Sequence, residues 1–175
     1  MKYHFIVNPK ARSGLGEMIW RRLEPELIKR RTAYQCCLTT KRKEAGRIAS
    51  DITSDGKPHT LVVLGGDGTL NEVINGIACP EKTTLGYIPI GSSNDFARGL
   101  GLPKDPERAM EMILHPAGIR KIDIGEVTGG SRSSRFLVSA GIGFDAAVCH
   151  EVCVSKWKVF LNRIGLGKLS YAVVA

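Results

Sequence analysis

Apolar residues along the first two thirds of the chain follow two alternating patterns, one typical of buried strands and one typical of amphipathic helices. Short β-branched and aromatic runs predict four strands, at residues 3–7, 34–38, 60–64 and 84–88. Between and after them, apolar residues recur every three to four positions and predict helices beginning near residues 16, 45, 69 and 105. Strands that alternate with helices favour an α/β fold, in which helices cover both faces of a parallel sheet.

The pattern changes after Gly118. Two strand-like runs, residues 121–127 and 135–140, flank the turn-rich stretch 128–134 and predict a hairpin instead of another crossover. We therefore expect an α/β domain over residues 1–118 and the beginning of a second, β-rich domain over 119–175. The sequence stops inside an apolar run with no helix-stop signal, which favours a fragment of a longer protein.

Composition and charge narrow the class of partner. The 175 residues carry a net charge of +8, which favours anionic partners such as nucleotides, nucleic acids or membrane surfaces. The basic clusters do not alternate with aromatic residues, so we expect no nucleic-acid partner. Five scattered cysteines without a CxxC pair fit a reducing compartment, and no apolar run is long enough for a membrane span. We expect a cytoplasmic protein, with peripheral contact to an anionic membrane and homodimer formation left open.

A glycine-rich segment directly after the third predicted strand carries the strongest functional signal. Residues 65–76 read GGDGTLNEVING, and the helical periodicity begins within this segment. Glycines allow positive φ and close approach to a phosphate, and the N–H groups of a helix N-terminus face an anion. Thr69 is the expected N-cap, with Glu72 completing a capping box. This segment predicts a phosphate-binding turn and a bound nucleotide, most simply MgATP.

Asp67 lies in the middle of this turn, where its charge would repel a phosphate. The repulsion is relieved if Asp67 binds Mg²⁺, directly or through water, or accepts hydrogen bonds from a ribose or from backbone amides. We expect Mg²⁺ with the nucleotide, held in part by Asp67. A tight hairpin turn is the alternative for an Asp-Gly pair, but the residues that follow have helical periodicity.

Two better-known phosphate motifs were compared with the chain. The P-loop pattern G-x-x-x-x-G-K-[ST] does not occur in it. Residues 141–146 match G-x-G-x-x-A after a predicted strand, which is typical of a dinucleotide fold. The ribose-binding acid expected about 20 residues later is missing, however, because residues 158–167 contain no Asp or Glu.

A second polar loop, residues 91–95, follows the fourth predicted strand and should lie at the same edge of the sheet as Asp67. Ser92 and Asn94 can donate to phosphate oxygens, and Asp95 can accept or help hold a cation. Alternatively, residues 92–95 cap a helix that begins at Phe96, and both roles are compatible.

These motifs resemble those of the bacterial diacylglycerol and lipid kinases, which are related to sphingosine and ceramide kinases and more distantly to NAD kinases. GGDGTLNEVING is the family's signature, and residues 91–103 (GSSNDFARGLGLP) are similar to its G-T-x-N-D-F-A-R segment. Asn8-Pro9 with Ser13-Gly14 resembles its first nucleotide loop, while residues 123–125 (DIG) and 140–145 (AGIGFD) resemble the start of its second domain.

The resemblance implies a three-layer α/β nucleotide domain followed by a β-sandwich, and an enzyme that transfers the γ-phosphoryl group of ATP to a lipid hydroxyl. Ser92 stands where the family has threonine, and residues 41–46 lack the G-[HD]-A pattern that fixes the register near Thr39. The implied nucleotide contacts are Asn8, Pro9, Lys10, Ala11, Arg12, Ser13, Gly14, Thr39, Thr40, Gly65, Gly66, Asp67, Gly68, Thr69, Leu70, Asn71 and Ser92, with Asn94 and Asp95 beside them.

Catalysis depends on a residue that this sequence lacks. In the family, an Asp in a D-G-E motif of the second domain is the general base, and neither Asp-Gly pair here is followed by Glu. We expect the base to lie beyond Ala175, so that this chain alone binds MgATP weakly and phosphorylates little or no lipid. A non-catalytic nucleotide-binding module and an NAD kinase relative are the alternatives.

Overall fold

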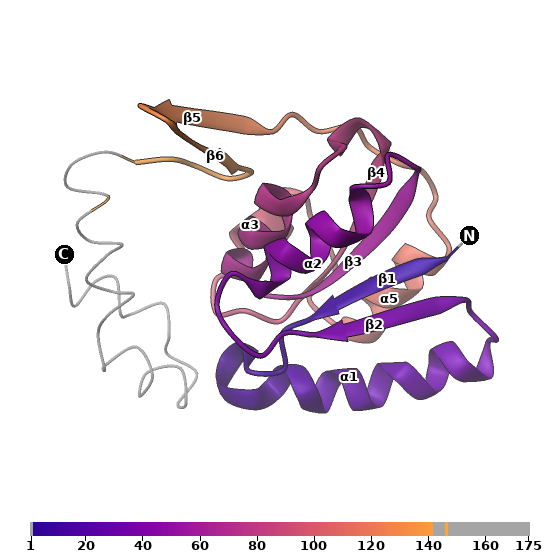
Figure 1. Ribbon diagram of the computed structural model, residues 1–175. Helices are drawn as coiled ribbons and strands as arrows, with labels where there is room; N and C mark the ends of the chain where they lie inside the picture. Colours follow the sequence, from indigo (N-terminus) through magenta and orange to yellow (C-terminus); the bar gives the residue numbers. More distant parts are fainter. Residues whose placement is uncertain (1, 142–145, 147–175) are drawn as a thin grey trace.

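The structure is a computed structural model that describes residues 2–141 and 146 (Figure 1). One four-stranded sheet forms its centre, with the strand order β2-β1-β3-β4 and every neighbouring pair parallel. Val7 lies opposite both Leu38 and Leu64, so the carboxyl ends of these strands meet at one edge. The strands are β1 (Tyr3–Val7), β2 (Tyr34–Leu38), β3 (His59–Gly65) and β4 (Thr83–Pro89).

Helices cover both faces of this sheet. Helices α1 and α5 pack on one face, while α2, α3 and α4 pack on the other (Figure 1). The prediction of a three-layer α/β fold is therefore confirmed. The helical segments are α1 (Ala11–Lys29), α2 (Glu44–Thr53), α3 (Asp67–Gly76), the 3-10 turn η1 (Pro80–Lys82), α4 (Asp95–Gly99) and α5 (Pro106–Leu114).

Alternation of side chains along the strands creates two cores. On β1, Phe5 and Val7 pack toward α1 and α5, while Ile6 packs toward α2 and α3. The inner strand β3 is apolar on both faces because Leu61–Leu64 are fully buried between the two helical layers. The uninterrupted apolar run of β3 therefore follows from its central place in a parallel sheet.

Helix α1 starts irregularly. Arg12, Ser13 and Gly14 have left-handed angles, with φ of 47°, 60° and 99°, so the regular helix begins after them. The predicted loop at residues 10–14 is present in this form, directly after β1. Within α1, non-helical angles are confined to these three residues, and the backbone keeps helical angles at Pro25.

The predicted hairpin is confirmed as β5 (Gly125–Gly129) and β6 (Arg132–Phe136), which pair antiparallel. Its turn is shorter than the sequence indicated, because Gly130 adopts a left-handed φ of 59° and closes a tight connection. Most of the G-x-G-x-x-A and AGIGFD segments and the final apolar run lie outside the described residues. The domain boundary at residue 118 stays a prediction.

Candidate nucleotide-binding site

Loops from all four parallel strands meet at the carboxyl edge of the sheet. The backbone N–H of Asn8 donates to Leu64, and that of Thr39 donates to Val7, at 2.9 and 2.8 Å. The Ile90 N–H donates to the carbonyl of Gly65 at 2.9 Å. These bonds continue β1, β2 and β4 by one residue each, and the predicted loops 8–14, 39–40, 65–71 and 92–95 lie on one side of the molecule.

The Asp67 side chain joins the phosphate turn to the second polar loop. Its Oδ2 accepts the N–H of Asp95 at 3.1 Å, and its Oδ1 accepts the N–H of Phe96 at 3.3 Å. Asp67 therefore caps α4. Acceptance of hydrogen bonds from backbone amides is one of the roles expected for this carboxylate from the sequence. Asn94, the N-cap residue of α4, makes no side-chain capping bond, so the cap comes from a residue far away in the sequence.

Asn94 instead closes its own loop. Its Oδ1 accepts the N–H of Gly91 at 2.8 Å, and its Nδ2 donates to the carbonyl of the same residue at 3.0 Å. Asn94 adopts a left-handed φ of 51°, which asparagine tolerates better than most residues. In this arrangement the Asn94 amide braces the loop. Its contact with a phosphate stays a prediction.

The glycines of the turn serve close packing instead of a left-handed backbone, which corrects the positive-φ expectation. A Cβ on Gly66 would lie 3.0 Å from the Cα of Gly91, and one on Gly65 would lie 2.7 Å from the Cβ of Thr69. Gly65, Gly66 and Gly68 all lack positive φ. Around Gly68 a Cβ would meet no atom within 4 Å, so this position faces open space.

Thr69 is not the N-cap, and the predicted capping box with Glu72 does not form. Helix α3 begins two residues earlier, with Gly66 at the N-cap and no side-chain capping bond. Thr69 lies inside the first turn, buried, and its hydroxyl oxygen accepts the side-chain amide of Asn8 at 2.9 Å. The Thr69 hydroxyl therefore bonds to the Asn8 side chain instead of capping the helix.

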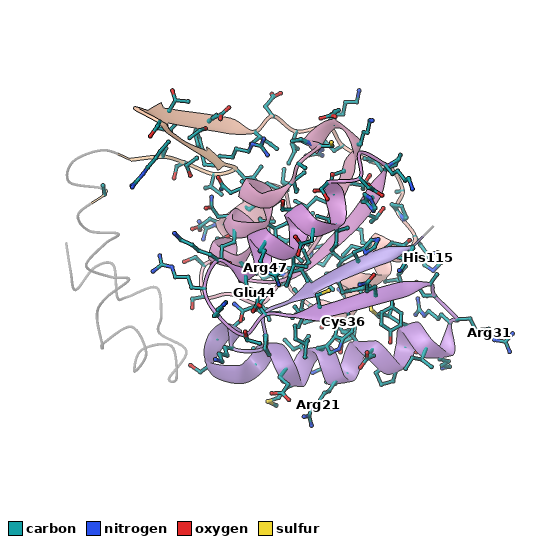
Figure 2. The ribbon with its side chains drawn as sticks, in the orientation of Figure 1. Arg21, Arg31, Cys36, Glu44, Arg47 and His115 are labelled. Carbon is teal, nitrogen blue, oxygen red and sulfur yellow. The ribbon has the colours of Figure 1, made fainter. Side chains whose placement is uncertain are left out.

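A hydrogen-bonded chain links the first two loops. The Lys10 ammonium donates to the carbonyl of Thr40 at 3.1 Å, while the N–H and hydroxyl of Thr40 donate to Glu44 at 2.6 and 2.8 Å. These donors lower the pKa of Glu44 to about 2. Figure 2 shows Glu44 beside Arg47 at the start of α2, near the ends of β1 and β2. Thr39, by contrast, is buried.

No sequence motif singles out Glu44 or Tyr87. Tyr87 on β4 is 3% exposed, and its hydroxyl has no hydrogen-bond partner among the described residues. Burial raises the pKa of Tyr87, and the charges of Asp67 and Asp95 raise it further. The Tyr87 ring lies 6.0 Å from the ring of Phe96, measured between centroids. Neither residue belongs to a recognisable motif, so only the folded arrangement reveals them.

A small pocket of about 170 Å³ adjoins Asp67. Its apolar lining comes from Leu70, Ile74 and Phe96 and from residues 136–138. Asn71 also lines the pocket, and its side-chain amide donates to the carbonyl of Arg135 at 3.1 Å. The structure therefore places Asn71, predicted to contact the nucleotide, against the hairpin.

Two absences apply to the described part of the chain. No cluster of three or more His, Cys, Asp or Glu side chains there could hold a metal ion by protein ligands alone. Within the same residues, none of the helices combines the length and the apolar character that crossing a bilayer requires.

Comparison with known proteins adds to this geometry. The family described as the diacylglycerol kinase catalytic domain matches residues 2–127. A diacylglycerol kinase of Staphylococcus carnosus is 32% identical over 166 residues, covering 90% of this chain and 49% of that protein. One from Bacillus subtilis is 41% identical over 106 residues, covering 59% and 33%. A crystal structure of a diacylglycerol kinase from Bacillus anthracis has a TM-score of 0.57 at 33% identity, covering 65% and 43%.

The parallel sheet with converging polar loops at its carboxyl edge defines an α/β domain of the class that binds ligands at that edge. The chain belongs to the diacylglycerol kinase catalytic domain family. It spans about half the length of the first curated relatives that it matches.

Proposed function

We propose that this chain supplies the MgATP-binding part of an ATP-dependent lipid kinase, which transfers the γ-phosphoryl group to a lipid hydroxyl such as that of diacylglycerol. The observation that carries the proposal is the bond between Asp67 and the first turn of α4. This bond joins the GGDGT and NDFAR loops at one edge, in a chain of the diacylglycerol kinase family. Residues 1–118 form the nucleotide domain in this proposal, and residue 119 begins the second domain.

The phosphates would lie against the start of α3. The free space at Gly68 and the unpaired N–H groups of the first helical turn suit an anion. The Lys10 ammonium and the exposed Arg12 and Ser13 add donors at the same edge. Ser92 keeps the hydroxyl that the family motif supplies with threonine.

The residues present fit a magnesium ion that arrives with ATP. Among the described residues, each oxygen of Asp67 accepts one amide, which leaves a lone pair on each for a metal-bound water. Mg²⁺ commonly keeps several waters and binds through one or two carboxylates plus phosphates, which suits the lack of a complete protein cage. When bound, the ion would neutralise phosphate charge, while Asp67 orients its hydration shell.

The acceptor lipid would approach through the pocket beside Asp67. Its walls are apolar apart from Asp67, Asn71 and Ser139, which suits the end of a lipid that carries one reacting hydroxyl. The exposed cluster Lys41–Lys43 follows β2 at the same edge, and basic residues near an anionic surface contribute about 1 kcal/mol each. We infer a cytoplasmic protein with peripheral membrane contact.

Catalysis needs more than the described residues provide. Phosphoryl transfer depends on positioning and charge neutralisation, with a further residue that orients the nucleophile. No D-G-E motif occurs in the chain, so we expect MgATP binding with little or no lipid phosphorylation by these 175 residues.

Two measurements test this proposal. Calorimetry with MgATP should detect binding to the chain, and γ-labelled ATP supplied with diacylglycerol in detergent micelles should transfer little or no label. An absence of MgATP binding would exclude the proposed site, and rapid labelling of the lipid would show that the chain carries its own base. Transfer of label to NAD but not to diacylglycerol would favour the NAD kinase alternative. Unchanged MgATP affinity in Asp67→Asn would place the nucleotide elsewhere.

A further inference from the structure

The second half of the GGDGTLNEVING segment faces the hairpin. Asn75 donates from its Nδ2 to the carbonyl of Arg135 at 2.9 Å, and its Oδ1 accepts the N–H of the same residue at 2.8 Å. Asn71, one helical turn earlier, donates to the same carbonyl at 3.1 Å. Because residues four apart lie on one face of a helix, both amides meet β6 together.

The Asn75 contact has the geometry of strand pairing. A side-chain amide carries one acceptor and donors like a peptide group, and here it satisfies both backbone groups of Arg135. Arg135 lies opposite Glu126 of β5 in the hairpin. The amide of Asn75 therefore replaces a further strand at the outer edge of β6, and this contact is independent of the side chain at position 135.

The Arg135 side chain adds a second, separate contact. Its Nη1 donates to the carbonyls of Ile74 and Ile77 at 3.2 and 2.7 Å. Carbonyl groups in the last turn of a helix lack partners within the helix, and a cation is favoured there. Two contacts thus hold the hairpin on α3: the Asn75 side chain bonds to the backbone of Arg135, and the Arg135 guanidinium bonds to carbonyls at the end of α3.

We propose that Asn75 is a positioning residue, which docks the hairpin on α3 and thereby sets residues 136–138 opposite Asp67 across the pocket. Phe136 follows Arg135 directly, so fixing the backbone of residue 135 fixes the side of β6 on which Phe136 lies. A slip of one residue would turn the Phe136 side chain to the opposite face. Asp67 and Asn75 lie on the same helix, α3 (Asp67–Gly76), so a hairpin held by Asn75 has a defined position relative to Asp67.

The contact between the hairpin and α3 needs no ligand. Its effect on the pocket for an acceptor lipid rests on the proposed function. A test can therefore use the 175-residue chain without nucleotide. Amide hydrogen exchange, followed by NMR, reports the Arg135 N–H, and methyl contacts between Ile74 and Val138 report the pocket. In Asn75→Ala we expect the Arg135 amide to exchange about fivefold faster or more and the methyl contacts to weaken.

Two further variants separate the contribution of the Asn75 hydrogen bonds from that of the Arg135 side chain. Asn75→Asp keeps the acceptor for the Arg135 N–H but, when ionised, has no donor for its carbonyl, so we expect an intermediate exchange rate. Acidification that protonates this carboxyl should restore the missing donor and strengthen the Ile74–Val138 methyl contacts again. Arg135→Ala should preserve the backbone pairing and accelerate exchange of the residue 135 amide less than Asn75→Ala.

The Phe96 amide, capped by Asp67, serves as the internal control and should keep its exchange rate in all three variants. Unchanged Arg135 exchange and methyl contacts in Asn75→Ala would overturn the proposal, as would wild-type behaviour of Asn75→Asp at neutral pH. Calorimetry with MgATP on the unmodified chain addresses the proposed function separately, because a failure to bind nucleotide leaves the exchange result intact.

Discussion

The carboxylate of Asp67 accepts the backbone N–H of Asp95 at 3.1 Å, across 28 residues of sequence. This bond connects the GGDGT turn, residues 65–69, to the second polar loop, residues 91–95. The other carboxylate oxygen of Asp67 accepts the Phe96 N–H, so the short helix α4 is capped by a residue from another loop. A negative charge at a helix N-terminus is also favoured by the helix dipole.

Replacement of Asp67 by Asn should weaken MgATP binding by at least about tenfold, because a charge-assisted hydrogen bond and the proposed magnesium contact would be lost together. The amide can accept only through its oxygen, which leaves one N–H of α4 without a partner. Calorimetry measures the affinity. The matched control is Asp51→Asn, which removes an exposed charge paired with Arg47 on α2 and should leave the affinity unchanged. Equal losses in both variants would indicate a general electrostatic effect.

Gly91→Ala should destabilise the fold by about 1–3 kcal/mol, because the new Cβ would overpack the contact between the two site loops. It would lie 2.6 Å from the Cα of Gly66 and 2.7 Å from the Oδ1 of Asn94. Urea unfolding gives the free energy of unfolding. Gly99→Ala in α4 is the control, since a Cβ there meets no atom within 4 Å and should be neutral or stabilising. A neutral Gly91→Ala would mean that the loops separate at little cost.

Glu44 should make the loop between β2 and α2 sensitive to acid. Thr40 holds the pKa of Glu44 at about 2, below its ordinary value of 4.5. Its stabilising contribution is therefore complete above pH 4.5 and is lost as the pH falls toward 2. The protection factor of the Thr40 amide, its exchange rate relative to the intrinsic rate at the same pH, should fall over this range in the wild type and change less in Glu44→Gln. Glu81→Gln, an exposed substitution in η1, should behave as the wild type.

His4 should make the opposite edge of the sheet sensitive to milder acid. Burial lowers the pKa of His4, and the neighbouring His59 and Lys2 lower it further, while Asp55 opposes them. The unfolded chain then takes up a proton on His4 at higher pH than the folded chain does. Stability from this site is complete above the ordinary histidine pKa of about 6.5 and is lost as the pH falls below it.

Urea unfolding between pH 8 and pH 5 measures this dependence. His4→Phe keeps an aromatic ring against His59, 5.3 Å away between centroids, and should flatten the slope of unfolding free energy against pH. His115→Gln on the exposed end of α5 should not change the slope. The assignment to His4 fails if the His4→Phe slope matches the wild type.

Local sequence patterns were sufficient for most elements of the fold. The bounds of β1 and β2 agree with the prediction, because short apolar runs bounded by Pro9 or by polar residues leave little choice. The start of α3 was misjudged by two residues. Thr69 is a residue type that commonly caps helices, but its hydroxyl accepts a hydrogen bond from the Asn8 side chain, 61 residues away in the sequence.

The sequence by itself determined which loops leave the carboxyl edge of a parallel sheet, since alternating strand and helix periods imply crossover connections between parallel strands. Only the tertiary structure decided what the polar side chains in those loops bind. Asp67 caps α4, Asn94 braces Gly91 and Asn75 holds Arg135. Such partners depend on distances between chain segments that no local pattern encodes, because each amide or carboxylate can pair with any complementary group that folding brings within about 3 Å.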